Sequence, residues 1–201
     1  MGINAYVDSY LPFDFHTETA GATVASNIDE EVPGQDGKRL ALVGFNYIVA
    51  TTPHTLSVMH CGSLAGSRNS ASAAAAAAQK VLNVNTAPTD PAGDAAASLD
   101  IIAYKVTGGA WEFNTISALS TKAITLTNNI AVAVESGAPV RIFGELTNGY
   151  SFKFALPIGT THYEDTILMQ APYKGDPLYV SIDNATTAGK LNNLLFAYIN
   201  K

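Results

Sequence analysis

Residues 111–127 read WEFNTISALSTKAITLT, a stretch in which polar and apolar side chains alternate along most of its length. Alternation with a period of two is the pattern of a half-buried β-strand. A Gly-Gly pair precedes the stretch and an Asn-Asn pair follows it, and both pairs are typical of turns. The stretch is almost free of charge and holds no cluster of catalytic residue types. It therefore predicts a β-hairpin with no chemistry of its own.

The rest of the chain has the same character, and no segment shows the period of an amphipathic helix. In 38–50 apolar residues occupy both faces, which predicts a strand that is covered on both sides. The Gly-, Ser- and Ala-rich segment 62–79 favours a loop that ends in an extended or weakly helical Ala run. The fold class expected is all-β. Strands are predicted near 38–50, 55–61, 81–84, 99–106, 110–118, 122–127, 139–143, 151–156, 177–183 and 194–200.

The lengths of the predicted strands suggest that the chain forms two domains. The longer, aromatic-rich strands of 38–84 and 148–201 predict a β-sandwich, jelly-roll-like domain, and the short strands of 86–146 predict a small β-barrel inserted into it. Residues 1–37 mix aromatic and acidic side chains without a persistent period. We expect an extended N-terminal arm there, with one short strand near 22–25.

Charge is distributed unevenly along the chain. The net charge is −6, and residues 1–37 hold seven acidic residues and no Lys or Arg. The remaining residues hold ten acids and eleven bases. This asymmetry is typical of an interaction segment, and it argues against nucleic acid as a partner because phosphate binding requires clustered Lys and Arg. A plain solubilising role for these acids is the alternative.

The cysteine count and the lengths of the apolar runs argue against two further classes, disulfide-stabilised proteins and helical membrane proteins. Cys61 is the single cysteine, so no intrachain disulfide can form. The apolar runs are far shorter than the roughly 20 residues of a membrane helix, and the N-terminus lacks the basic region of a secretory signal. A soluble protein with no membrane partner is expected.

Candidate catalytic and metal-binding residues are few. His60 and Cys61 are adjacent, but neighbours in a strand point to opposite faces, so a buried apolar cysteine is favoured over a reactive thiol. Asp90, Asp94 and Asp100 crowd one loop, yet they lack the alternating acids of an EF-hand, and turn acids commonly bond their own backbone.

Two other features invite a functional interpretation. The adjacent acids Glu164 and Asp165 do not converge from separate elements, as paired catalytic carboxylates must. Trp111 could serve as a sugar platform, but it alternates in phase with Phe113, so a core position is favoured. The sequence therefore predicts no enzyme, no catalytic residue, no metal site and no cofactor.

One long segment resembles a known family. Residues 100–146 read DIIAYKVTGGAWEFNTISALSTKAITLTNNIAVAVESGAPVRIFGEL. This order of strands and turns, with QKVLNVN (79–85) before it, resembles the head decoration (cement) proteins of tailed bacteriophages. The resemblance covers about 79–146. It implies a virion protein, made in the host cytoplasm, that binds the outside of the capsid as a homotrimer and ties major capsid protein subunits together. It brings no catalytic residues.

The acidic arm would make the capsid contact under this interpretation. Its aromatic residues would bury against the neighbouring subunit and its acids would pair with basic groups there. The partner-binding residues expected are Tyr6, Asp8, Tyr10, Phe13, Asp14, Phe15, Glu18, Asp29, Glu30 and Glu31. One alternative is a receptor- or glycan-binding module of a tail fibre or tailspike, which would use exposed aromatics such as Tyr163, Tyr173 or Tyr179. A small hydrolase is a third, weaker alternative.

Overall fold

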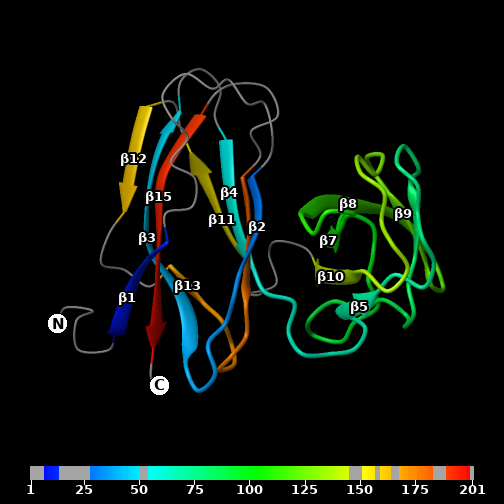
Figure 1. The fold of residues 1–201 in the computed structure, drawn as a ribbon, viewed down its shortest axis with the longest axis horizontal. Helices are drawn as coiled ribbons and strands as arrows, with labels where there is room; N and C mark the ends of the chain where they lie inside the picture. The colour runs from blue at the N-terminus through cyan, green and yellow to red at the C-terminus, as the bar shows by residue number, and fades with distance from the viewer. Residues whose placement is uncertain are drawn as a thin grey trace. The chain divides into compact units, whose positions relative to one another are not determined.

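The protein is represented by a computed structural model, which describes residues 7–13, 28–49, 54–144, 151–156, 159–163, 168–182 and 189–199. These described residues form fifteen β-strands and no helix, so the prediction of an all-β fold is confirmed (Figure 1). The described part of the chain accordingly offers no helix with the length and hydropathy needed to cross a bilayer.

The chain divides into two compact units. Unit 1 consists of Met1–Val58 and Phe152–Lys201, and unit 2 consists of Met59–Ser151. The sequence-based division began the inserted module at residue 86, and the structure moves that boundary to Met59. The reason is that the short strands β5 (Arg68–Ser70) and β6 (Val81–Asn83) pair with strands of unit 2.

Unit 1 contains two sheets. The five-stranded sheet has the order β1-β15-β3-β12, and β13 also pairs with β3. Its strands are β1 (Val7–Phe13), β3 (Arg39–Val49), β12 (Gly159–Tyr163), β13 (Met169–Gln170) and β15 (Gly189–Ile199). The four-stranded sheet has the order β11-β4-β14-β2. Its strands are β2 (Ile28–Val32), β4 (His54–Met59), β11 (Ser151–Leu156) and β14 (Leu178–Ile182).

Side chains of the two sheets share one core, which makes unit 1 a β-sandwich. Leu40 and Leu42 of β3 pack in the same cluster as Val180 of β14 from the other sheet. Ala41 and Val43 lie outside that cluster but are equally inaccessible, with exposed fractions of 0% and 1%. The expectation that this strand is covered on both sides is therefore confirmed for residues 40–43.

Unit 2 is built on one six-stranded sheet with the order β5-β10-β7-β8-β9-β6. Besides β5 and β6, its strands are β7 (Ile101–Lys105), β8 (Trp111–Ser120), β9 (Ala123–Leu126) and β10 (Pro139–Gly144). The sheet curls until its two ends meet, where an antiparallel bridge joins Ala71, next to β5, to Val84, next to β6.

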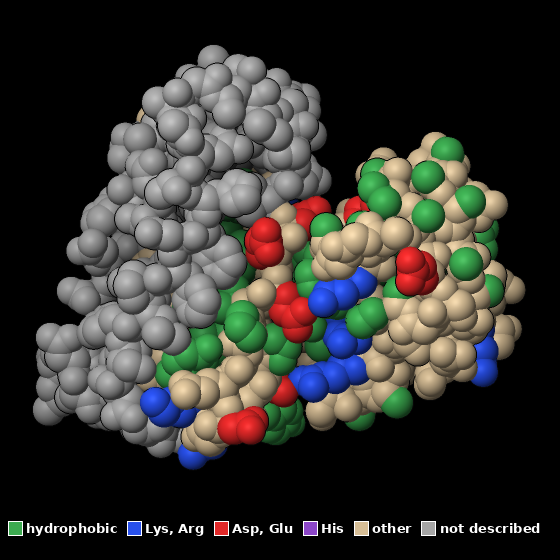
Figure 2. Space-filling view, in the orientation of Figure 1, with side chains coloured by type: hydrophobic (Ala, Val, Ile, Leu, Met, Phe, Trp, Pro, Cys, Tyr) green, Lys and Arg blue, Asp and Glu red, His purple; other side chains and the backbone are tan. Residues whose placement is uncertain are grey.

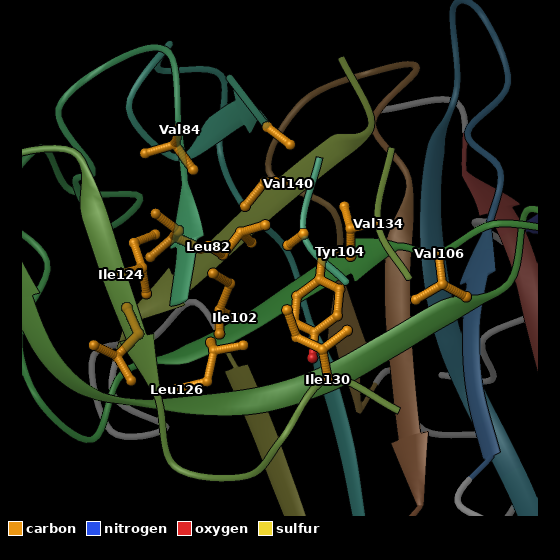
Figure 3. Close-up of a cluster of buried hydrophobic side chains, with 14 residues drawn as sticks. Leu82, Val84, Ile102, Tyr104, Val106, Ile124, Leu126, Ile130, Val134 and Val140 are labelled. Atoms are coloured by element: carbon orange, nitrogen blue, oxygen red, sulfur yellow. The ribbon is translucent and has the colours of Figure 1, made fainter. Parts of the chain in front are cut away.

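The curled sheet encloses a second hydrophobic core (Figure 3). Leu82 of β6, Ile102 of β7 and Ile124 of β9 point toward one another, and each is fully buried. Burial of one such side chain stabilises the fold by about 1.5–3 kcal/mol. The alternation read from residues 111–127 thus corresponds to β8 and β9 and places Ile116 and Ile124 on the inner face.

The Ala run of 71–79 forms no helix and passes along the segment 130–134. The Ala75 amide donates to the Val134 carbonyl and the Val134 amide donates to the Ala75 carbonyl, at distances of 2.9 and 2.8 Å. The Ala78 amide donates to the Ile130 carbonyl. These bonds replace those of a helix, and the small side chain of Ala75 fits into the core. Of the two expected forms, the extended one is found.

Candidate functional site

The structure places six of the ten predicted partner-binding residues in two separate strands. Asp8, Tyr10 and Phe13 lie in β1, and Asp29, Glu30 and Glu31 lie in β2. The other four, together with the strand expected near 22–25, lie outside the described residues. The strands β1 and β2 belong to different sheets, and each is the last strand of its sheet. The expected free arm is therefore corrected: where it is described, it is part of unit 1.

Strand β2 is fixed in the fold by its backbone and by its acidic side chains. It pairs antiparallel with β14, in a register that sets Asp29 opposite Ser181 and Glu31 opposite Tyr179. The Ser181 hydroxyl donates to Oδ1 of Asp29 at 2.7 Å, and the Tyr179 hydroxyl donates to Oε1 of Glu31 at 3.4 Å. Sequence reasoning missed this strand because IDEEV is acidic at three successive positions.

The residues that follow β2 hold its end in place. The Tyr198 hydroxyl of β15 donates to the Pro33 carbonyl at 2.9 Å, and burial raises the pKa of Tyr198 above its ordinary value. A Cβ on Gly34 would clash with the Gly175 carbonyl, so only glycine permits this close approach. The Gly175 amide in turn donates to the Lys38 carbonyl at 2.9 Å.

Strand β1 pairs with β15, so the described beginning of the chain lies beside its end. The register sets Tyr10 opposite Ala197 and Phe13 opposite Leu194. Pro12 has no amide hydrogen, and proline within a sheet is confined largely to edge strands. Pro12 is therefore compatible with the position of β1 at the end of its sheet. The same proline interrupts the alternating pattern of β1, so the strand was not predicted from the sequence.

The candidate nucleophile Cys61 and its neighbour His60 each contact the backbone of Gly62. Both are buried, with exposed fractions of 2% and 5%. The Gly62 amide donates to Nδ1 of His60 at 3.2 Å, and the Cys61 thiol points to the Gly62 carbonyl at 3.7 Å. Each side chain thus contacts the adjoining backbone, as expected of a buried structural cysteine.

The loop acids of unit 2 bind backbone amides. Oδ1 of Asp90 accepts hydrogen bonds from the amides of Ala92, Gly93 and Asp94 at 2.8–3.0 Å. Oδ2 of Asp100 accepts the Ala97 amide at 2.8 Å. Such bonds are the usual role of Asp in turns. Across the described ranges, no three His, Cys, Asp or Glu side chains are grouped as a metal site would require.

The aromatic candidates have different environments. Trp111 is 8% exposed, with the Lys105 ammonium 5.5 Å and the Arg141 guanidinium 5.7 Å from its ring centroid. The prediction that Trp111 is buried is confirmed. Tyr179 is 1% exposed, which removes it from the residues proposed to bind sugars, whereas Tyr173 is 58% exposed. The side chain of Tyr163 and the pair at 164–165 lie outside what the structure describes.

A polar network inside unit 2 was not predicted. The Tyr104 hydroxyl donates to Oε1 of Glu112 at 2.6 Å, and the same carboxylate accepts the amides of Ala131 and Val132. Asn114 accepts the Asn128 amide at 3.1 Å. The network holds the segment 128–132 against β8. Its only sequence signal is the presence of Glu112 and Asn114 on the same strand face as the core residue Ile116.

Comparison of the chain with protein-family models, with curated proteins and with solved structures finds no match. A functional proposal therefore depends on the geometry of the described residues and on the resemblance carried by residues 100–146. Cys61 is buried, and Asp90 and Asp100 bond to backbone amides. The strands at the ends of the two sheets of unit 1 are the candidate functional surface.

Proposed function

We propose that the protein is a virion structural protein of a tailed bacteriophage, a capsid decoration protein that binds the outside of the head and stabilises it. The resemblance in residues 100–146 supports this role, and that segment holds β7 to β10 of unit 2. The face of unit 2 seen in Figure 2 is also suited to a particle exterior, because, apart from one group of Lys and Arg side chains, it is mostly uncharged with single apolar side chains scattered over it.

The observation that carries the proposal is the position of β1 and β2. Within the described residues, β1 pairs only with β15 and β2 pairs only with β14. A strand at the end of a sheet can accept a strand from another chain through its backbone. The acidic side chains of β2 would favour a partner segment that carries Lys or Arg. The capsid contact would then be strand addition to a fixed edge.

The partners proposed are the major capsid protein and two further copies of this chain in a homotrimer. A homotrimer that contacts several capsid subunits at once would bind the head more tightly than a single copy, because the linked contacts raise the overall affinity. The chain's net charge of −6 gives no support to nucleic acid as a further partner.

Binding to undecorated heads tests the proposal. Purified protein is mixed with heads that lack decoration, the heads are sedimented, and the protein in the pellet is measured. Truncation at residue 35 is a poor test because it would remove β1 and β2 from the sandwich. The test variant is Asp29→Asn, Glu30→Gln, Glu31→Gln, which keeps oxygen acceptors for Ser181 and Tyr179 while removing three charges. We expect about tenfold weaker binding.

The matched control removes three charges from unit 2 through Asp90→Asn, Asp94→Asn and Glu135→Gln. It should bind heads as the unaltered protein does, and circular dichroism checks that both variants are folded. Failure of the unaltered protein to sediment with heads would overturn the proposed function. Equal binding by the two variants would remove β2 from the contact.

A receptor- or glycan-binding module of a tail fibre or tailspike is the second candidate. The exposed side chain of Tyr173 favours it, because aromatic rings commonly stack on sugars. Binding of the protein to host cells, lost in Tyr173→Ala and retained in Tyr173→Phe, would support this candidate. Absence of cell binding together with head binding would exclude it.

A further inference from the structure

We propose that a shallow hollow on unit 2 binds a carboxylate-bearing saccharide. The hollow has a volume of about 450 Å³ and lies where the two ends of the curled sheet meet. It goes beyond the proposed function, which assigns no small ligand to unit 2. The residues that line it are Ser72, Ala73, Asn83, Val84, Asn85, Ser120, Lys122 and Ala123.

Backbone hydrogen bonds fix the walls of this hollow. The Ser72 amide donates to the Asn83 carbonyl at 2.8 Å, which ties the two sheet ends together. The Val84 amide donates to the Lys122 carbonyl at 2.9 Å, and Asn83 pairs with Ala123 in the β6–β9 ladder. Lys122, Asn83 and Ser72 are therefore presented from a rigid frame. A fixed backbone reduces the conformational entropy that is lost when a ligand binds, and only the exposed side chains remain to be ordered.

The charge in the hollow is of one sign. Lys122 is its single charged lining residue, and it is exposed. Within the described ranges, the side chains of Asn83, Ser120 and Lys122 make no hydrogen bond or ion pair, so their polar atoms are available to a ligand. A second hollow of about 340 Å³ is lined by both Lys105 and Glu135 and has no such bias.

The lining chemistry matches an acidic sugar. The Lys122 ammonium can pair with a carboxylate. The Asn83 amide and the Ser72 and Ser120 hydroxyls offer the donors and acceptors that sugar hydroxyls need. The Asn85 side-chain nitrogen already donates to the Ser70 hydroxyl at 2.9 Å, so Asn85 contributes its oxygen as an acceptor. No carboxylate or imidazole lines the hollow, so it lacks the acid pair that glycoside hydrolysis uses. The site would bind its ligand without cleaving it.

Amide-resolved NMR with trigalacturonic acid tests the inference. We expect chemical-shift changes at Ser72, Asn83, Lys122 and Ala123, saturating with ligand. Maltotriose, which is neutral, and inorganic phosphate, which lacks the sugar, should each shift these amides far less. Equal effects of phosphate would mean a simple anion site, and shifts spread over the surface would mean non-specific contact. Either result overturns the proposal.

Two lysine variants give the decisive comparison. Lys122→Gln should weaken binding by about tenfold, because it removes the charge-assisted hydrogen bond. Lys80→Gln is the matched control, because the Lys80 ammonium lies outside the hollow and donates to the Thr127 carbonyl. Equal affinity in the two variants would overturn the proposal. Lys122→Gln should still sediment with undecorated heads, so the two proposals can fail separately.

Discussion

The Tyr104 hydroxyl donates a 2.6 Å hydrogen bond to Oε1 of Glu112, on the neighbouring strand. The Glu112 carboxylate also accepts the amides of Ala131 and Val132, so one side chain joins β7, β8 and the segment that follows β9. The fully buried ring of Tyr104 belongs to the core of unit 2. The core and the segment beside the Ala run are thereby connected through one acidic residue.

Replacement of Glu112 should destabilise the protein. Glu112→Ala leaves the Tyr104 hydroxyl and two backbone amides without their acceptor, and we expect a loss of about 2 kcal/mol in the free energy of unfolding. Urea denaturation measures it. Glu135→Ala, at an exposed position of the same unit, should change the free energy by less than about 0.5 kcal/mol. Equal effects of the two substitutions would contradict the role given to Glu112.

Substitution within the Ala run should separate buried from exposed positions. Ala75 is 4% exposed and belongs to the core, whereas Ala74 is exposed. Ala75→Val should cost about 1–3 kcal/mol through overpacking. Ala74→Val should be nearly neutral, within about 0.5 kcal/mol. Thermal unfolding of both variants checks this, and similar melting temperatures would argue against the path found for 71–79.

Addition of one methyl group at Gly34 should damage unit 1. A Cβ there would collide with the Gly175 backbone, which flexible side-chain movement cannot relieve. We expect Gly34→Ala to cost about 3 kcal/mol. Gly37→Ala provides the comparison, because Gly37 has a positive φ but open space around it, and left-handed strain alone costs about 1 kcal/mol. Chemical denaturation should rank the two variants in this order.

The stability of the protein should fall at alkaline pH because of the buried hydroxyl of Tyr198. Its pKa is raised in the folded protein, so the unfolded chain releases this proton more readily, and stability should fall as pH rises above about 10. Tyr198→Phe removes this dependence but loses the bond to Pro33, at a cost of about 1 kcal/mol near neutral pH.

Unfolding free energies for Tyr198→Phe and the unaltered protein, measured from neutral to strongly alkaline pH, test this sign. The difference between the two proteins should shrink as pH increases. A difference that grows with pH would mean that the folded state favours the ionised hydroxyl.

Period-two patterns predicted the strands whose two faces have different environments. In β11, Phe152 and Phe154 pack on the core of unit 1, and Lys153 between them is exposed, as the alternation predicted. In β14, Leu178, Val180 and Ile182 face that core. Tyr179, on the opposite face of β14, is nonetheless buried, and no local pattern signalled this.

The strands that sequence reasoning missed depend on distant partners. Strand β2 is acidic and β1 contains Pro12, and their pairing with β14 and β15 involves residues more than a hundred positions away. Strand β5 has three residues and is defined by its ladder with β10. The hollow at Lys122 was missed for the same reason, since closure of the sheet brings Ser72, Asn83 and Ser120 together.

The pairing of β1 with β15 also constrains the order in which the two units can fold during translation. Unit 2 is contiguous, so all of its strands are available once Ser151 has left the ribosome. Strand β15 lies between β1 and β3 in its sheet. In a nascent chain, β1 and the side of β3 that faces β15 therefore stay unpaired until β15 has emerged, while the other side of β3 can already pair with β12 and β13. During this period the open strand edges invite contact with chaperones or with other nascent chains.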